Sequence, residues 1–353
     1  MLVRLAGGPP YSDPMDVLVC AAQVPFMRGG LEMLVDNLVE ALRTAGHRAE
    51  AVRLPAAWDR ERLLDAALAW RMVPLDADVV IATNFPSYFA RHPRKVLWLA
   101  HQHRGAYDGI DQPWSDLGGD EDGLAIQRQL TEWDTRAIGE ASPRFTIGRV
   151  VSERLARYCG LDSTPLHHPP PLADRLTTGP FGNYVFGVNR LEANKRPDLV
   201  VGGLLAARSG VRGVVAGTGS MRPELEAAID AAGGGRRVEL PGFVTDDDLV
   251  PLLAGCLGVI YTPYDEDYGY VTLQAFLAGK PVITTTDSGG VLDWVEHGVT
   301  GLVVEPAAGS IGEAVDRLAG DPPMAARLGA AGRARAAALD WKTVVDTLLR
   351  DDA

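Results

Sequence analysis

Short apolar runs that alternate with amphipathic segments are the feature that most limits what this chain can fold into. Residues 17–22 form a wholly apolar run of strand length, as expected of a parallel strand buried on both faces. Apolar residues then recur at helical spacing over residues 31–42, and Gly46 marks the end of that helix. Further strands are predicted over residues 79–82 and 95–100. The alternation predicts a parallel α/β domain, in which ligands bind at the carboxyl ends of the strands.

A proline-rich segment over residues 165–182 interrupts this pattern, which then restarts. Six more strands are predicted, over residues 184–188, 211–216, 237–240, 257–262, 281–285 and 301–304. Helical segments separate them, and Thr245 is expected to cap a helix that opens with three aspartates. We therefore expect an N-terminal domain over residues 1–170, a second α/β domain over residues 171–335 and a helical tail over residues 336–353.

The charge balance argues against a nucleic acid as partner. The chain has 34 Lys and Arg residues against 46 Asp and Glu residues, which gives a formal net charge of -12. No broad basic surface is therefore expected that could neutralise a phosphate backbone. A local basic site for a single diphosphate is still compatible with this balance.

Cysteine usage and hydropathy indicate the compartment. Cys20, Cys159 and Cys256 are far apart, and none has metal-site spacing, so we expect buried, reduced thiols. No apolar run reaches the length that spans a bilayer, and the N-terminus lacks the pattern of a secretion signal. We expect a cytoplasmic protein whose contact with membranes is at most peripheral. The sequence does not indicate its oligomeric state.

Two basic residues follow the first strand of the second half. Arg190 and Lys195 stand in the loop after the strand at residues 184–188. An arginine offers a planar fork to phosphate oxygens, and a lysine offers a mobile point charge. This pair therefore predicts a diphosphate site at the carboxyl end of the strand; the alternative is two solvated loop charges.

An acidic loop precedes a glycine and a helix start later in the same half. Asp265, Glu266 and Asp267 come before Gly269, and the helix is predicted over residues 270–278. The first N–H groups of a helix attract an anion, so acids beside them are costly unless they bind something else, such as sugar hydroxyls. Gln274 lies in this helix, within reach of a ribose.

Three further patterns in this half are weaker. Gly289-Gly290 forms another strand-to-helix turn, of a kind that is common. The acids at 265–267 also fit a D-x-D pattern for a divalent metal, but a metal would be redundant beside an Arg–Lys pair, so we expect none. Gly217-Thr218-Gly219 resembles a dinucleotide motif, yet Arg222 stands where the next glycine should be, which argues against a dehydrogenase.

Together these segments resemble the donor domain of the retaining glycosyltransferases of the GT-B fold, family 4, also called glycosyl transferases group 1. Arg190 and Lys195 match the family's diphosphate-binding pair. Glu266 matches the first glutamate of its Glu-seven-residues-Glu motif, which faces the transferred sugar. Gln274 stands at the second position, where the family has a carboxylate that holds the ribose hydroxyls. This is a departure, although a glutamine can also donate and accept hydrogen bonds.

The resemblance implies roles for further residues. Gly29-Gly30 corresponds to a first-domain loop that closes on the phosphates, and His101 to a histidine near the sugar and the acceptor. Residues 241–244 correspond to the segment whose backbone meets the nucleobase, and the C-terminal helix with Trp341 to one that crosses back onto the first domain. The implied catalytic residues are Glu266, His101, Arg190 and Lys195. The implied donor-binding residues are Gly29, Gly30, Arg190, Lys195, Gly242, Phe243, Val244, Asp267, Tyr268, Gly269, Tyr270, Val271 and Gln274.

By resemblance the fold is GT-B, with two facing Rossmann-like domains, parallel sheets and a cleft between them. The implied activity is the transfer of a hexose-type sugar, with retained anomeric configuration, from a UDP-, GDP- or other nucleotide-activated sugar. The acceptor would be a hydroxyl of a saccharide, a lipid-linked compound or a small molecule, and no metal or other cofactor is implied. Two alternatives stay open: an isomerase like the nucleotide-sugar 2-epimerases, and a non-catalytic nucleotide-sugar-binding member, which Gln274 favours.

Overall fold

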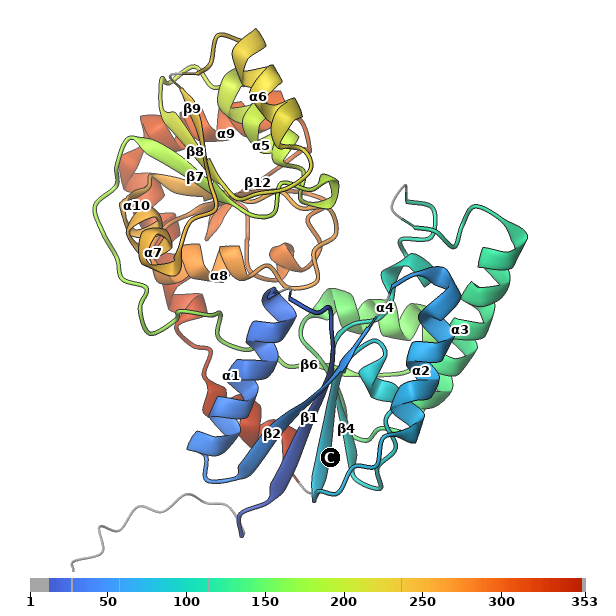
Figure 1. Ribbon diagram of the computed structural model, residues 1–353. Helices are drawn as coiled ribbons and strands as arrows, with labels where there is room; N and C mark the ends of the chain where they lie inside the picture. The colour runs from blue at the N-terminus through green and yellow to red at the C-terminus, as the bar shows by residue number, and fades with distance from the viewer. Residues whose placement is uncertain (1–12, 27, 57, 113–114, 236, 351–353) are drawn as a thin grey trace, which may run out of the picture. The chain divides into compact units, whose positions relative to one another are not determined.

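The computed structural model describes residues 13–350, except for residues 27, 57, 113, 114 and 236. The chain forms two compact units (Figure 1). Unit 1 comprises Met1–His168 and Trp341–Ala353, and unit 2 comprises Pro169–Asp340. Each unit contains one six-stranded sheet. None of the helices that the structure describes has both the length and the apolar composition needed to cross a lipid bilayer.

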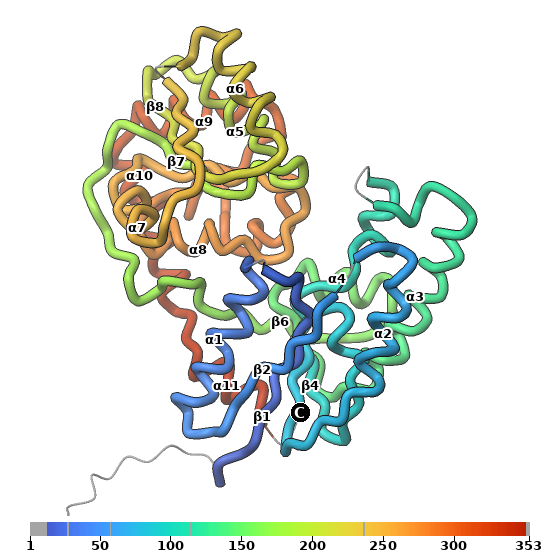
Figure 2. The backbone as a smooth tube through the Cα atoms, viewed as in Figure 1, coloured from blue at the N-terminus to red at the C-terminus, as the bar shows by residue number. Residues whose placement is uncertain are grey.

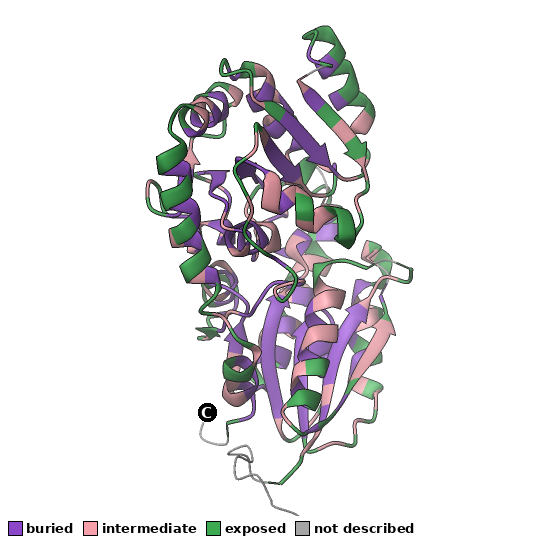
Figure 3. Ribbon diagram, turned by 90° about the vertical axis from the view of Figure 1, so that its left-hand side faces the viewer, coloured by how far each residue is buried: buried purple, intermediate pink, exposed green. Residues whose placement is uncertain are grey.

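The sheet of unit 1 has the strand order β2-β1-β3-β4-β5-β6, and every neighbouring pair is parallel. Its strands are β1 (Asp16–Gln23), β2 (Arg48–Pro55), β3 (Val79–Asn84), β4 (Lys95–His101), β5 (Arg144–Thr146) and β6 (Thr164–Pro165). The central strands β3 and β4 are buried almost throughout (Figure 3), as their apolar runs predict. Because the strands are parallel, their carboxyl ends share one edge of the sheet, where β4 ends at His101.

Helices cover both faces of this sheet (Figure 1). They are α1 (Gly30–Thr44), α2 (Leu63–Met72), α3 (Glu121–Gly139), α4 (Arg149–Cys159) and α11 (Trp341–Leu348), with short 3-10 turns η1 (Arg60–Arg62), η2 (Ser87–Phe89) and η3 (Arg104–Ala106). The predicted helix at residues 31–42 is confirmed as α1, and Gly46 follows it with a φ of +98°. The three cysteines are free and buried, and burial raises the pKa of Cys20 and Cys256 to about 12.

The helix α11 packs within unit 1, although the whole of unit 2 precedes it in the sequence (Figure 2). It lies beside α1 and buries Val344, Val345 and Leu348. The ring of Trp341 meets Trp98 edge-on, with 6.2 Å between ring centroids, and stacks on His168 at 5.5 Å. The chain therefore passes from unit 1 to unit 2 and back again.

The sheet of unit 2 has the order β12-β11-β10-β7-β8-β9, and it too is parallel throughout. Its strands are β7 (Tyr184–Val188), β8 (Arg212–Ala216), β9 (Val238–Gly242), β10 (Gly258–Ile260), β11 (Val282–Thr285) and β12 (Gly301–Val304). All six strands predicted for the second half are therefore present. The strands β7, β10 and β11 are neighbours, so the loops that follow them lie together.

The helices of unit 2 are α5 (Pro197–Ala206), α6 (Arg222–Ala231), α7 (Asp246–Gly255), α8 (Tyr270–Leu277), α9 (Ala308–Gly320) and α10 (Pro322–Ala336), with the 3-10 turns η4 (Ala193–Lys195) and η5 (Gly290–Asp293). Thr245 caps α7 as predicted, because its hydroxyl accepts a hydrogen bond from the Asp248 N–H at 3.3 Å. The helix α5 packs on α9, and α8 packs on α10. Their buried apolar residues form the core of this unit.

Candidate functional site

Three loops meet at the carboxyl edge of the unit 2 sheet. They are the segments 189–196, 261–269 and 286–290, which follow β7, β10 and β11. The Tyr264 N–H donates to the carbonyl of Asn194 at 3.0 Å, and the Asp265 N–H donates to the carbonyl of Asp287 at 3.0 Å. The three segments that the sequence singled out thus form one continuous surface of hydrogen-bonded loops.

Lys195 and Glu266 form an ion pair in this structure. The lysine ammonium donates to Oε2 of the glutamate, and the same oxygen accepts a hydrogen bond from the Tyr261 hydroxyl at 2.9 Å. The two charged side chains are only 17% and 18% exposed. By resemblance the two residues bind different parts of the donor, whereas in this structure they pair with each other.

Tyr261 contacts Glu266 but was not among the predicted site residues. Burial, and then the charge of Glu266, raise the pKa of its hydroxyl well above the ordinary value. The hydroxyl therefore stays protonated and donates to the carboxylate. Tyr261 directly follows β10, but a tyrosine after a buried strand carries no spacing pattern that marks it as part of a site.

Arg190 is exposed near the start of the segment 189–196. No described residue makes a hydrogen bond or ion pair with its guanidinium, which leaves its donors available to a ligand. The loop around it is fixed by Glu192, whose carboxylate accepts hydrogen bonds from the hydroxyl and the N–H of Ser220 at 2.7 and 3.1 Å. These hydrogen bonds, and more weakly the charge of Arg190, lower the pKa of Glu192.

The Gly217-Thr218-Gly219 turn has a packing role beside this loop. The Leu191 N–H donates to the carbonyl of Thr218 at 2.8 Å. Gly217 has a φ of +134°, and a Cβ atom there would lie 1.8 Å from the carbonyl oxygen of Asn189. Only glycine permits this close approach of two backbones. The glycines of this turn therefore position the Arg190 loop. This packing role explains their presence without the binding of a dinucleotide.

Arg196 joins all three loops, although no sequence pattern distinguishes its role from that of its neighbour Lys195. Its guanidinium donates to both carboxylate oxygens of Asp287 at 2.8 Å, and to the carbonyls of Thr262 and Pro263 at 2.9 and 2.8 Å. These donors hold the pKa of Asp287 below its usual range. The charge of Arg196 is therefore used to join the loops, whereas Lys195 pairs with a single carboxylate, that of Glu266, and no described residue pairs with Arg190.

The segment 267–271 leads into α8. Gly269 is the N-cap with a φ of +82°, and Tyr270 and Val271 are the first residues of the helix. The first N–H groups of a helix lack intrahelical acceptors and carry the positive end of the helix dipole. The Tyr268 ring is buried and packs edge-on against Tyr270, while the Asp267 carbonyl lies against Gly290. Of these predicted donor-binding residues, Tyr268 uses its side chain for packing.

Gln274 lies in the second turn of α8 and is only 7% exposed. Its Nε2 donates to the carbonyl of Pro171 at 3.2 Å, within unit 2. The amide is therefore oriented by the backbone, and its donor is used. A glutamate at this position would place a carboxylate against that carbonyl instead.

The predicted nucleobase segment lies at the end of β9. Gly242 has a φ of +84°, and its carbonyl accepts a hydrogen bond from the Gly217 N–H at 2.7 Å. Phe243 follows with 77% of its surface exposed, and Val244 comes next. This segment is thus joined to the turn that supports Arg190, two strands away from the ion pair.

The remaining predicted residues belong to unit 1. Gly29 is the N-cap of α1 and Gly30 its first residue, and the Gly29 N–H donates to Glu32 at 2.8 Å. His101 ends β4, and its Nδ1 lies 3.1 Å from the carbonyl of Gln102. That contact requires a proton on Nδ1, so Nε2 of a neutral ring is an acceptor. Both positions lie at the carboxyl edge of the unit 1 sheet.

His103 differs from its neighbour His101. It is packed against Trp58 and Phe85, with ring centroids 6.0 and 5.5 Å away. Burial lowers its pKa to about 4, so the ring is neutral at physiological pH. His103 therefore acts as a packing residue, and His101 is the histidine of this pair at the strand end.

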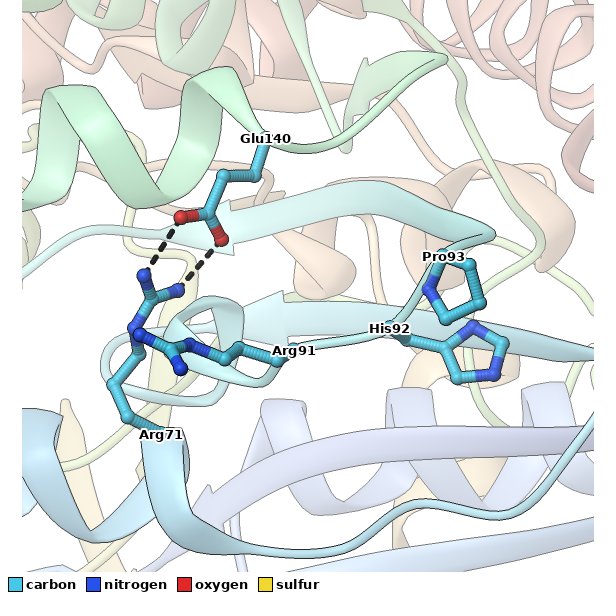
Figure 4. Close-up of a pocket in the computed structure, with 5 residues that line it drawn as sticks. All are labelled: Arg71, Arg91, His92, Pro93 and Glu140. Carbon is cyan, nitrogen blue, oxygen red and sulfur yellow. Dashed lines mark hydrogen bonds and ion pairs between the residues drawn. The ribbon is translucent and has the colours of Figure 1, made fainter.

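A cavity at the opposite, amino edge of the unit 1 sheet is lined by Arg71, Arg91, His92, Pro93 and Glu140 (Figure 4). The Arg71 guanidinium donates to both oxygens of Glu140 at 2.6 and 2.7 Å. The buried Lys95 ammonium reaches the same carboxylate at 3.1 Å and donates to three backbone carbonyls. The Glu140 carboxylate thus pairs with both cations, and these hydrogen bonds fasten η2 and α3 to β4, so the cluster is structural.

Comparisons with known proteins place unit 2 in one family. Residues 180–335 match the family described as Glycosyl transferases group 1. The chain is 36% identical over 112 residues to the alpha-1,3/1,6-mannosyltransferase ALG2 of Homo sapiens, a match that covers 32% of this chain and spans only 27% of that relative. It is 26% identical to a GDP-mannose-dependent alpha-(1-6)-phosphatidylinositol monomannoside mannosyltransferase of Mycobacterium tuberculosis, over 96% of this chain and 99% of the relative.

A solved structure gives the fold. HepE of Anabaena in complex with UDP-glucose superposes with a TM-score of 0.72 at 18% identity, over 95% of this chain and 98% of HepE. At this level of identity the likeness concerns the fold alone. It confirms the predicted GT-B fold, in which two α/β units each carry a parallel sheet.

Proposed function

We propose that this chain, whose residues 180–335 match the glycosyl transferases group 1 family, moves a hexose-type sugar from a nucleotide diphosphate sugar to an acceptor hydroxyl. One observation carries the proposal: the Arg190–Lys195 loop, Glu266 and the start of α8 lie together at one sheet edge. Unit 2 would hold the donor, and unit 1 with α11 the acceptor. We further propose that the protein acts in the cytoplasm, with at most peripheral membrane contact.

The diphosphate leaving group would be stabilised by cations and N–H groups. Cleavage of the sugar–phosphate bond develops negative charge on the diphosphate, and oriented donors lower the barrier. Arg190 offers unused donors, and Lys195 can exchange the Glu266 carboxylate for phosphate oxygens because its long stem is mobile. The N–H groups near Gly269 would add the field of the α8 dipole.

The sugar, ribose and base would be bound by neutral and acidic groups around these cations. Once Lys195 turns to the diphosphate, the Glu266 carboxylate is free to accept hydrogen bonds from sugar hydroxyls. Gln274 would face the ribose, and the backbone of residues 242–244 the base. Residues 267–271 would line the path between them.

Retention of configuration would need no protein nucleophile. By resemblance to the family, the acceptor oxygen attacks from the face that the diphosphate leaves. A new bond forms between that oxygen and the anomeric carbon while the bond to the phosphate oxygen breaks, and the acceptor proton passes to a diphosphate oxygen. His101 would position the donor sugar or the acceptor, and Gly29 and Gly30 would close on the phosphates.

The proposal is tested with a panel of nucleotide sugars. The names of relatives suggest GDP-mannose and UDP-glucose as the first two donors. A bound donor raises the melting temperature by mass action, and slow hydrolysis releases the nucleoside diphosphate. We expect at least one donor to do both, and nucleoside monophosphates to do neither. A panel without any shift or release would refute the proposal.

The same assay separates the two alternatives. An isomerase would convert the nucleotide sugar into its epimer without an acceptor, which NMR of the sugar detects. A non-catalytic member would bind a donor but release nothing. Transfer to added saccharide or lipid-linked acceptors would identify the acceptor class.

A further inference from the structure

One oxygen atom of Glu266 has two hydrogen-bond donors of different mobility. Oε2 receives the Lys195 ammonium and the Tyr261 hydroxyl, the latter at 2.9 Å. Lys195 ends the short turn η4 and reaches the carboxylate through a flexible stem. Tyr261 approaches the same atom from the end of a buried strand.

The Tyr261 side chain is held rigidly. It is only 4% exposed, and its backbone N–H donates to the carbonyl of Ile283 on the neighbouring strand at 2.9 Å. A Cβ atom on Gly269 would lie 3.3 Å from the Tyr261 ring, so the ring is packed directly under the start of α8. The hydroxyl is therefore a fixed donor, placed by the sheet and the helix cap together.

The backbone of Glu266 is equally fixed. Its N–H donates to the carbonyl of Ser288 at 3.3 Å, and its carbonyl accepts from the Gly290 N–H at 2.6 Å. The remaining freedom of Glu266 lies in its side-chain torsions. In this structure Lys195 and Tyr261 limit these torsions together, because both donate to Oε2.

We propose that Tyr261 is a positioning residue that holds Glu266 in place when Lys195 turns to the diphosphate. This inference rests on the proposed function, in which the lysine leaves the carboxylate as the donor binds. Tyr261 would then be the remaining partner of Oε2, and the other lone pairs of the carboxylate would meet the sugar hydroxyls. Tyr261 itself would touch neither the donor nor the acceptor.

The test compares Tyr261→Phe with a matched control, Tyr184→Phe. The Tyr184 hydroxyl is also partly buried in unit 2 and donates to the carbonyl of Leu252 at 2.8 Å, but it lies at the start of β7, away from the site. We expect kcat to fall by about 10-fold to 100-fold in Tyr261→Phe, the size of a lost hydrogen bond to a charged group. Affinity for the nucleoside diphosphate should stay within about twofold of wild type, because Tyr261 does not reach the phosphates. Tyr184→Phe should keep normal kcat.

A double-mutant cycle with Glu266→Ala separates positioning from mere stability, because alanine removes the acceptor of the Tyr261 hydroxyl. If Tyr261 acts through the carboxylate, Tyr261→Phe should cost nothing further in the Glu266→Ala background. Normal kcat in Tyr261→Phe, or a full additional loss in the double variant, would overturn the inference while leaving glycosyl transfer intact. A wild-type protein that binds no nucleotide sugar would instead refute the proposed function, and this inference with it.

Discussion

Lys195 carries the largest expected effect of any single residue. In the free protein its charge is compensated by Glu266, so it does not repel Arg190 or leave an unpaired ammonium. Donor binding would replace the Glu266 carboxylate by phosphate oxygens as the partner of the Lys195 ammonium. Each state therefore gives the lysine an anionic partner.

We therefore predict that Lys195→Ala lowers turnover by about 100-fold or more, the range seen when one donor to a developing anion is removed. Affinity for the nucleoside diphosphate should fall as well, because Glu266 is then unpaired and repels the incoming phosphates. Steady-state kinetics and calorimetric titration would measure both. Lys342→Ala is the control, since Lys342 also pairs with a carboxylate, Asp346, but on α11. Near-normal turnover in Lys195→Ala would contradict the site assignment.

A second prediction concerns the side chain of Gln274. Gln274→Glu would replace the donor to the Pro171 carbonyl by an acceptor, leaving two oxygens facing each other in a buried place. We expect the free protein to lose about 1–3 kcal/mol of stability, the cost of an unsatisfied buried polar group. A donor whose ribose hydroxyls supply the missing hydrogens should restore part of this loss. Urea denaturation with and without donor would test both; an unchanged free protein would contradict the role given to Pro171.

Among the elements, the turn at Gly289-Gly290 supports the Glu266 loop. Gly289 has a φ of +60°, and a Cβ there would lie 2.7 Å from the Glu266 N. Gly289→Ala should therefore destabilise unit 2 by more than about 2 kcal/mol and weaken donor binding, because backbone strain and a backbone clash add. Gly298→Ala is a matched control: its φ is +75°, but nothing lies within 4 Å of the new methyl. Equal effects of the two changes would show that the clash does not matter.

The helix α3 explains why part of unit 1 was not predicted. The sequence suggested no element between residues 101 and 164, where the structure has α3, β5, α4 and β6. The buried positions of α3 include Leu130, Asp134 and Ile138 at helical spacing, so an acid interrupts the apolar stripe. The strands β5 and β6 are too short to stand out. In unit 2, by contrast, most strands are short apolar runs beside glycine or proline, and all six were predicted.

Asp134 itself gives a prediction about pH. It is fully buried on α3, its Oδ2 lies 2.5 Å from the Tyr107 hydroxyl, and burial raises its pKa to about 7 from an ordinary 3.8. In the native state it holds its proton up to about pH 7, whereas the unfolded chain releases it near pH 4. Its contribution to stability is therefore full below the unfolded pKa and is lost as the pH rises through 7.

We predict that the free energy of unfolding of the wild type falls, relative to that of Asp134→Asn, between about pH 4 and pH 7, and levels off at higher pH. The asparagine has no proton to lose, so the variant serves as the reference. Urea denaturation of both proteins at several pH values would measure the difference. Parallel pH profiles would contradict a raised pKa in the native state.

The site illustrates the same limit of sequence patterns. Spacing and residue type singled out Arg190, Lys195 and Glu266, because cations and acids near strand ends are visible in a sequence. The partners that decide their state were not visible. Tyr261 directly follows a buried strand and fits no spacing pattern. Arg196 is a second basic residue beside Lys195, and only its contacts show that it joins the loops. Side-chain geometry decides which of these charged groups pairs with other residues of the protein and which is left to bind a ligand.

The helix α11 makes unit 1 discontinuous in the sequence, because the whole of unit 2 lies between it and the rest of unit 1. A chain that ends at Asp340 would lose four buried aliphatic side chains, those of Val344, Val345, Leu348 and Leu349, and the Trp341 contact with Trp98. Each such side chain contributes about 1.5–3 kcal/mol, which is a large part of the stability of a domain. We predict that this truncation weakens hydrogen-exchange protection in β1, β3 and β4 but not in β7, β8 and β10. Loss of protection in unit 2 instead would contradict the division of the chain.

The return of α11 also bears on biosynthesis. Domains generally fold as units while the ribosome is still adding residues at the other end. Unit 2 is contiguous and can complete its core once residue 340 has emerged, but unit 1 waits for residues 341–348 to cover Trp98. Most of unit 1 is therefore synthesised first, but unit 1 completes its fold last. Until then it exposes apolar surface of the kind that a chaperone would recognise.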